Sequence, residues 1–373
     1  MNRRWVRLMA VIFTLGFVAS GCGGDEDSAA EPPAGSAEPA GPVEVVFIYE
    51  NPSKTVGWES TFEDARLALD EQFGDQIVTS FVDRVPASPE GRNEIKRIAA
   101  NGPDLIIGTT FGHGKFMQEL ATEFPDVHFL VSQFEVPEGV ENFSGYDLRV
   151  EDGWYLSGVA AGMVAANTGE KAVGWIDGFA IPFELRQLNG FTLGYQEVVP
   201  DGKVQVVLTN SWYDPQAAAQ ASNGLLDAGS GMLASALSDP TVGEIAEQRN
   251  VPYSAVYPLT TFTPNSGVTG PRFRWEALFA PKIQSIIDGT WEPTYDYFGA
   301  KEGAMDVAPF EKAFTGNVTQ EQVDEYEQIA KALTDGEIVV LPGTTEELTT
   351  LNYVVPGVGG LDLQVREVPP PNS

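Results

Sequence analysis

The most informative stretch of the chain is residues 43–82, VEVVFIYENPSKTVGWESTFEDARLALDEQFGDQIVTSFV. It begins with an apolar, β-branched run at Val43–Tyr49 and continues with an amphipathic helical pattern at Trp58–Phe73. A second strand-like run follows at Gln76–Val82. A strand, a helix and a strand in this order predict a βαβ unit, in which a helix joins two parallel strands.

The same alternation continues along most of the chain, in two sets of about four units each. The first set adds strands at Asp104–Thr110 and Val127–Ser132, and helices at Pro89–Asn101 and His113–Phe124. The second set has strands at Lys171–Asp177, Lys203–Asn210, Gly231–Ser238 and Val251–Tyr257, and helices at Pro182–Val199, Asp214–Ala228 and Pro240–Asn250. We therefore predict the α/β fold class, with two Rossmann-like lobes.

The domain boundaries follow from these two sets. Lobe I is expected over residues 43–147 plus about 272–292, because the late helix at Phe273–Asp288 would return to the first lobe. Lobe II is expected over residues 148–271 plus part of 293–373. Open parallel sheets bind ligands at the carboxyl ends of their strands, so we expect a ligand cleft between the lobes, closed by a hinge.

The N-terminal segment resembles a bacterial export signal. Three arginines precede an apolar run at Leu8–Val18, which is too short to span a bilayer, and small residues lead to Cys22, the only cysteine. We predict a signal peptide over residues 1–21 and acylation of Cys22; an ordinary signal peptide with an incidental cysteine is the alternative. Residues 22–42 are rich in Gly, Ala, Pro and acids, which predicts a disordered tether.

The strong negative charge limits the possible partners. The chain carries 53 acidic and 22 basic residues, a formal net charge of −31. Such a field repels phosphate backbones, so nucleic acid is not an expected partner. We interpret the acidity mainly as an adaptation for solubility.

The loops that follow the predicted strands carry aromatic and small residues. Trp58, Phe183 and Trp212 could stack on a planar ligand, although each could instead pack in a core. Phe111 and Gly112 end a strand, where backbone groups can approach a ring edge closely.

Three polar residues complete the candidate ligand-binding set. Asp239 and Asp177 follow strands and could accept hydrogen bonds from a ligand, while Asp239 could equally cap a helix. His113 lies in a glycine-rich loop at a predicted helix start.

The sequence indicates a non-catalytic protein. No Cys or His cluster has the spacing of a metal site, so we expect neither a metal nor another cofactor. No Gly-x-Ser-x-Gly elbow follows a strand, and we assign no catalytic residue.

Several segments together resemble the Bmp family of lipoprotein solute-binding proteins, the basic-membrane-protein or purine-nucleoside receptor group. These segments are Gly57-Trp58, Thr109–Gly112, Phe124–Phe129, Tyr155–Gly162, Gly190–Gly194 and Trp212–Pro215. The resemblance implies a type I periplasmic-binding-protein fold, an ABC permease as partner and a purine base or nucleoside as ligand.

Two segments differ from the commonest pattern of that family. The Gly57-Trp58 pair resembles the branch associated with a free base such as adenine, because an indole offers a stacking face. At Tyr257–Ser266 the usual Gly-Tyr-Asp-x-Asp segment is replaced, which alters part of the expected polar edge.

Three hypotheses for the function therefore stand side by side. The first is an exported, lipid-anchored receptor for a purine base or nucleoside, with adenine favoured. The second is the same fold binding a sugar or another small polar solute. The third is a nucleoside-processing hydrolase, which would need a cluster of carboxylates; the acids here are scattered.

Overall fold

The computed structural model describes residues 41–53, 57–256, 263–307, 317–361 and 366–367. Cys22, the predicted signal peptide, most of the predicted tether and the altered segment at 257–262 lie outside these residues. In the described part of the chain, every helix is too short or too polar to cross a membrane.

The first lobe is built on a six-stranded sheet with the strand order β11-β5-β4-β3-β1-β2, among the described residues. Each neighbouring pair is parallel. The strands are β1 (Val43–Ile48), β2 (Ile77–Val82), β3 (Leu105–Gly108), β4 (His128–Ser132), β5 (Phe143–Leu148) and β11 (Tyr295–Phe298). The β3 residues are all buried, as expected for a central strand covered on both faces.

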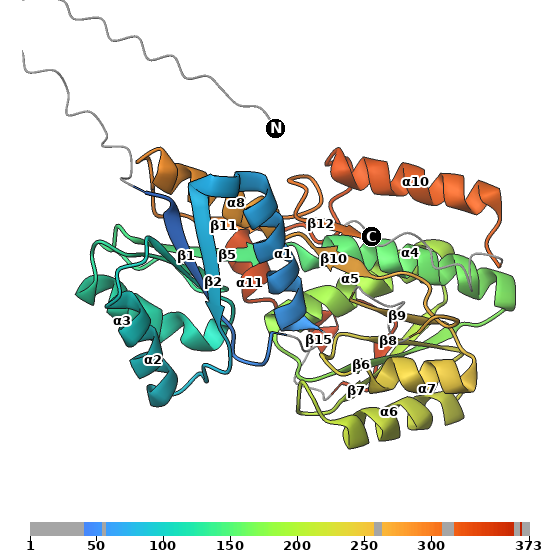
Figure 1. Cartoon of the computed structure of the whole chain (residues 1–373). Helices are drawn as coiled ribbons and strands as arrows, with labels where there is room; N and C mark the ends of the chain where they lie inside the picture. The colour runs from blue at the N-terminus through green and yellow to red at the C-terminus, as the bar shows by residue number, and fades with distance from the viewer. Residues whose placement is uncertain (1–40, 54–56, 257–262, 308–316, 362–365, 368–373) are drawn as a thin grey trace, which may run out of the picture. The chain divides into compact units, whose positions relative to one another are not determined.

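Helices cover both faces of this sheet. They are α1 (Trp58–Phe73), α2 (Pro89–Ala99), α3 (Gly114–Glu123) and α8 (Glu276–Ile287), with short 3₁₀ turns η1 (Gly74–Gln76) and η2 (Phe111–His113). The helices α2 and α3 pack on one face, around Ile95 and Leu120 (Figure 1). On the other face α8 packs against α1, where Phe62 and Trp275 stack with centroids 4.3 Å apart.

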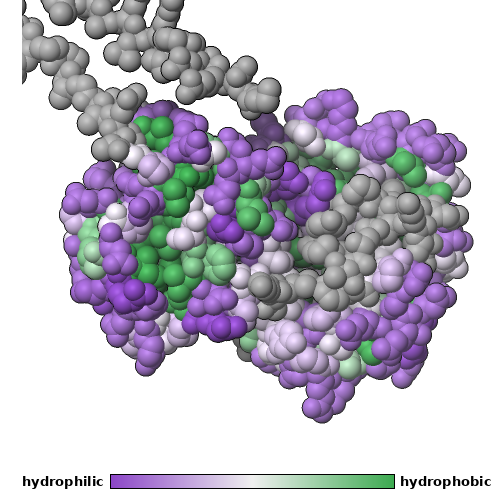
Figure 2. All heavy atoms as spheres, viewed as in Figure 1, coloured by the Kyte–Doolittle hydropathy of each residue, from purple (hydrophilic) through white to green (hydrophobic). Residues whose placement is uncertain are grey.

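The edge strand β2 leaves apolar side chains at the surface. Val78 and Phe81 are exposed, and Figure 2 shows apolar residues over this strand among hydrophilic ones. The Phe81 ring stacks on Tyr49 and lies 5.6 Å from the guanidinium carbon of Arg66. The first-lobe surface is therefore less uniformly charged than the composition suggests.

The second lobe is built on a five-stranded sheet with the strand order β14-β7-β6-β8-β9, among the described residues. Its neighbouring strands are also parallel. The strands are β6 (Ala172–Asp177), β7 (Lys203–Leu208), β8 (Met232–Ser235), β9 (Tyr253–Ala255) and β14 (Val358–Gly359); the helices are α4 (Val150–Thr168), α5 (Pro182–Val198), α6 (Pro215–Asp227) and α7 (Thr241–Arg249).

The helices α4 and α5 pack closely because glycines face each other's backbones. A Cβ atom on Gly158 would lie 2.1 Å from the Phe191 carbonyl oxygen, and one on Gly194 would lie 1.9 Å from that of Tyr155. Larger residues there would force the helices apart. Two of the segments that carry the family resemblance thus form this contact.

The remaining elements are short or lie late in the chain. They are β10 (Pro271–Phe273), β12 (Met305–Val307), α10 (Gln320–Thr334), α11 (Thr345–Thr349), β13 (Tyr353–Val354) and β15 (Arg366–Glu367). β10 and β12 pair antiparallel. β11 joins the first sheet at residues 295–298, beyond the expected limit near 292.

The structure confirms the predicted α/β class and the two parallel sheets. The strands and helices predicted from the alternation are present within a few residues of their expected bounds. The strand β5 and the helix α4 were not predicted. They follow one another where the chain passes from the first sheet to the second lobe.

Candidate functional site

Trp58 begins α1 and is fixed by hydrogen bonds at both ends. Its indole Nε1 donates to the carbonyl oxygen of Thr109, directly after β3, at 2.8 Å. Its backbone N–H donates to Ser238 Oγ at 3.3 Å, in the loop after β8 of the second lobe. The residue therefore connects strand ends of both sheets.

The indole of Trp58 lies in an aromatic cluster. Phe62, Trp275 and Phe273 of the first-lobe side approach it with centroids 5.2, 5.4 and 6.2 Å away, each near perpendicular. Phe183, the second residue of α5, approaches from the second lobe at 5.4 Å and 89°. Two of the predicted stacking residues, Trp58 and Phe183, are thus in direct contact across the lobes.

Gly57 allows the two lobes to approach at this point. Its φ angle is 116°, a conformation that side chains rarely adopt. A Cβ atom there would lie 2.6 Å from the Cβ of Ser238. Any larger residue would therefore collide with the second lobe as well as strain the backbone.

Asp177 and Glu184 form a buried acidic pair beside Phe183. Asp177 ends β6 and accepts hydrogen bonds from Trp175 Nε1 at 3.1 Å and from the Gly178 backbone N–H at 2.6 Å. Burial raises the pKa of Asp177 to about 7. These two hydrogen bonds, and one from Glu184, lower the pKa but do not offset the burial. Burial and the charge of Asp177 raise the pKa of Glu184 well above its usual value. At neutral pH Glu184 is therefore the protonated partner.

Asp239 lies next to Ser238 and is almost fully buried. Its Oδ1 accepts a hydrogen bond from the Thr241 backbone N–H at 2.9 Å, just before α7, although the N-cap residue of that helix is Pro240. Its Oδ2 is buried and has no hydrogen-bond partner among the described residues. Within the described part of the chain, one carboxylate oxygen is therefore left without a donor.

The other predicted aromatic residues pack elsewhere. Phe111 is 61% exposed, and its ring lies 5.8 Å from that of Phe134. Trp212 is 38% exposed and lies 4.9 Å from Phe179. Among the described ring pairs, neither contacts Trp58. The structure therefore does not pair Trp212 with Trp58 as facing walls.

Gly112 and His113 lie in η2, directly before α3. A Cβ on Gly112 would lie 2.5 Å from that of Ala87, so this glycine is required by packing. His113 is fully buried, and its Nε2 forms a hydrogen bond with the Val85 carbonyl at 2.8 Å. Burial lowers the pKa of His113, so the imidazole is neutral at pH 7. In this arrangement the ring supports the loop.

Glu184 and Ser238 were missed as candidates by the sequence analysis. An acid in the first turn of a helix is usually a response to the helix dipole, and serine after a strand is common. The signal for Glu184 was its place one residue after Phe183. Within the described residues, no group of three or more His, Cys, Asp or Glu side chains is arranged to hold a metal ion.

Comparison with known proteins identifies the family. The family model for PnrA-like ABC transporter substrate-binding proteins, Bmp, matches residues 43–334. A purine-binding protein of Brucella abortus is 31% identical over 281 residues, covering 74% of this chain and 78% of that protein. A Haloferax volcanii protein named as an ABC transporter glucose-binding protein is 29% identical, covering 82% and 75%.

Solved structures agree on the fold. An ABC transporter solute-binding protein from Conexibacter woesei superposes with a TM-score of 0.67 at 23% identity, covering 80% of this chain and 98% of that one. One from Aeropyrum pernix gives 0.67 at 16% identity, covering 83% and 96%. These neighbours are solute-binding proteins, so the predicted type I periplasmic-binding fold is confirmed. The chain belongs to the Bmp family of PnrA-like ABC transporter substrate-binding proteins.

Proposed function

We propose that the protein is an extracytoplasmic receptor that binds a purine base between its two lobes and delivers it to an ABC permease. The main support for this proposal is the contact between Trp58 and Phe183. Their ring centroids are 5.4 Å apart, and the two residues belong to different lobes. A planar ligand that enters between them replaces this contact and touches both lobes at once. Closure is then favoured by the ligand's contacts with both sides.

Stacking and polar contacts supply different parts of the recognition. Stacking of a base on an indole contributes about 1 to 3 kcal/mol and tolerates any purine. Buried carboxyl oxygens lie next to Ser238 and Phe183. They are Asp239 Oδ2, which has no hydrogen-bond partner among the described residues, and the oxygens of the Asp177–Glu184 pair. Oxygens that accept from an exocyclic amine and a ring N–H suit adenine and guanine, which carry both, better than hypoxanthine, which lacks the amine. Phe111, Gly112, Trp212 and His113 remain predicted ligand contacts.

The first experiment measures adenine binding by calorimetry in the wild type and in Trp58→Ala. We expect the variant to fold and to lose about tenfold or more in affinity, because the stacking face is removed. The control is Trp291→Ala, which removes a first-lobe indole that packs on His128 instead. Unchanged adenine affinity in Trp58→Ala would reject the assignment.

A sugar is the second candidate ligand, favoured by the similarity to the Haloferax protein named for glucose binding. Thermal shifts with adenine, hypoxanthine, adenosine and glucose separate the two classes. A ligand at 100 times its dissociation constant stabilises the folded state by about 2.7 kcal/mol. A shift with glucose alone would assign the protein to sugar binding.

An enzymatic role predicts a product rather than a complex. Incubation with adenosine followed by chromatography would show free adenine if the protein were a nucleoside hydrolase. We expect intact adenosine, because no residue of the described site is arranged as a nucleophile with a base.

Lipid attachment at Cys22 is a separate part of the proposal. Expression of the full chain should place it in the membrane fraction, and Cys22→Ser should release it into the soluble extracytoplasmic fraction. A variant that stays membrane-bound would mean that another segment holds the protein.

A further inference from the structure

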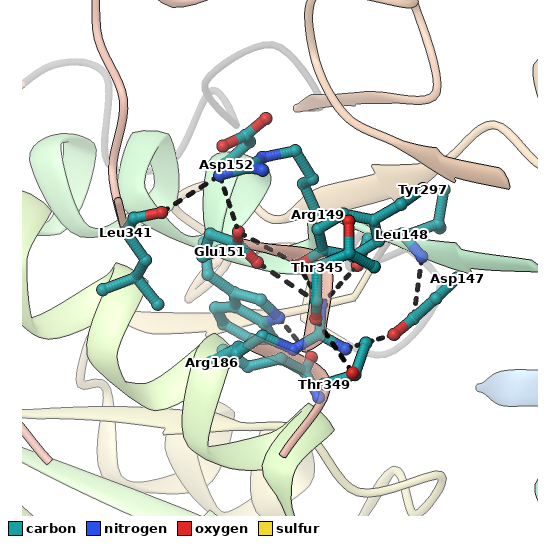
Figure 3. A network of polar contacts seen from close by, with 12 residues as sticks. Asp147, Leu148, Arg149, Glu151, Asp152, Arg186, Tyr297, Leu341, Thr345 and Thr349 are labelled. Atoms are coloured by element: carbon teal, nitrogen blue, oxygen red, sulfur yellow. Dashed lines mark hydrogen bonds and ion pairs between the residues drawn. The ribbon is translucent and has the colours of Figure 1, made fainter. Parts of the chain in front are cut away.

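Arg186 is a buried cation one helical turn after Phe183. It lies in α5 and is 1% exposed. Its Nη2 donates to Asp147 Oδ2 at 2.5 Å, and its Nη1 donates to the Leu148 carbonyl oxygen and to the Tyr297 hydroxyl, each at 2.7 Å (Figure 3). A buried guanidinium with three such partners has a single well-defined position.

The hydrogen-bond partners of Arg186 belong to the first lobe, and its Nη1 also lies 3.6 Å from Glu151 Oε2 of α4, in the second lobe. Asp147 and Leu148 are the last two residues of β5, and Tyr297 lies in β11 of the same sheet. The chain passes directly from Leu148 through Arg149 into α4. Arg186, from a second-lobe helix, therefore holds the point at which the chain leaves the first lobe.

The same guanidinium contacts Phe183, the proposed ligand contact of the second lobe. Its carbon lies 5.3 Å from the Phe183 ring centroid and 5.4 Å from that of Tyr297, so the guanidinium packs on one aromatic ring of each lobe. Phe183 in turn contacts Trp58. A continuous series of contacts thus runs from Trp58 through Phe183 and Arg186 to the end of β5.

We propose that Arg186 is a positioning residue. It couples Phe183, the proposed ligand contact of the second lobe, to Asp147 and Leu148, where the chain leaves the first lobe. This inference rests on the proposed function for its ligand-binding consequence. When a ligand displaces or turns the Phe183 ring, the guanidinium that packs on it transmits the change to the end of β5. In the opposite direction, the fixed guanidinium holds Phe183 against the first lobe.

Lysine cannot reproduce this arrangement. The guanidinium is planar, stacks on rings and donates to several acceptors at once, whereas an ammonium is a compact point charge. Arg186→Lys therefore keeps the positive charge beside Asp147 while it removes the ring contacts and part of the hydrogen bonding. The matched control is Arg249→Lys in α7, where the arginine is half-exposed and paired with Asp227 at 3.1 Å.

The first test needs no ligand. We expect the radius of gyration from small-angle X-ray scattering, measured well below the melting temperature, to increase in Arg186→Lys and to stay unchanged in Arg249→Lys. A merely structural contribution would lower the melting temperature without changing the lobe separation. An unchanged radius of gyration in the folded Arg186→Lys protein would overturn the coupling.

The second test is a double-mutant cycle on adenine affinity. We expect Arg186→Lys to lose about tenfold in the wild-type background, which lies within the range of a partly to fully desolvated cation–π contact. In the Phe183→Leu background the same change should cost less than about twofold, because the ring it positions is gone. Equal losses in both backgrounds would show that Arg186 acts independently of Phe183.

The two tests fail in different ways. A wild type that binds no adenine contradicts the proposed ligand, while the scattering comparison still decides the role of Arg186. If Arg186→Lys does not fold, Tyr297→Phe takes its place, because it removes only the hydroxyl that accepts from Nη1. We expect a smaller increase in radius of gyration for it, and no increase would count against the proposal.

Discussion

At the scale of single residues, the buried acids of the second lobe are the least expected feature. Asp177 is 2% exposed, and burial raises its pKa to about 7, compared with an ordinary value of 3.8. The folded state therefore holds a proton that the unfolded state has already released at pH 5 to 6. The stabilisation from this proton is fully present below the unfolded pKa and is lost as the pH rises through about 7.

Asp177→Asn should flatten the pH dependence of stability. One proton difference changes the free energy of unfolding by about 1.4 kcal/mol per pH unit, so the wild type should lose stability from pH 5 to 8 and the variant should lose less. Urea unfolding at four pH values measures this slope. Asp227→Asn, an exposed acid on α6, is the control and should keep the wild-type slope. A wild-type slope in Asp177→Asn would contradict the raised pKa.

The residues of the site differ in how far the sequence could predict them. Trp58 and Phe183 were predictable because each follows a strand and begins a helix, where ligands of parallel sheets bind. Arg186 and Glu184 were not, because a charged residue inside a helix usually faces solvent, and nothing local showed that both are buried. Their partners lie far along the chain, at Asp147 and Tyr297 for Arg186, so only the folded structure reveals them.

At the scale of elements, the contact between the loop before α1 and the loop after β8 is a candidate closing contact of the lobes. Gly57→Ala places a Cβ against Ser238 and strains the backbone at φ 116°. Strain of this kind costs about 1 to 3 kcal/mol. We expect the variant to bind adenine at least about tenfold more weakly, because the collision opposes lobe closure. Calorimetry measures the affinity, and X-ray scattering the lobe separation.

Two further variants separate the collision from the strain. Gly229→Ala strains a residue of similar φ, 103°, but its Cβ meets nothing within 4 Å. It should lower stability by a similar amount and leave adenine affinity unchanged. Ser238→Gly in the Gly57→Ala background should restore part of the affinity. Weak binding in Gly229→Ala as well would assign the effect to general destabilisation.

Elements with a clear period were predicted, and elements without one were missed. The helix α1 buries residues at intervals of three or four, such as Phe62, Ala65 and Leu69, so its helical period is visible in the sequence. In α4 every residue from Val150 to Ala165 is buried, which removes the polar face that marks a helix. The strand β5 reads FSGYDL, with Ser, Gly and Asp and no β-branched residue, and so does not resemble a β-branched strand such as β1, VEVVFI.

At the scale of the whole molecule, the excess of acids opposes folding. The formal net charge is −31, and like charges held together in a compact state repel one another. The visible face in Figure 2 is mainly hydrophilic, which fits charges carried at the surface. Salt screens such exposed charges, with a Debye length of about 10 Å at 0.1 M and about 3 Å at 1 M. The folded state should therefore gain stability when salt is added.

We expect the melting temperature at pH 7 to rise as sodium chloride increases from low concentration to 1 M. A gain of about 1 kcal/mol corresponds to a rise of about 2 °C or less for a folded chain of this size. The control is the same titration near the isoelectric point of about 4.2, where net repulsion is small and the rise should disappear. A melting temperature that falls with salt at pH 7 would mean that surface ion pairs, such as Arg92 with Glu119 and Glu123, outweigh the repulsion.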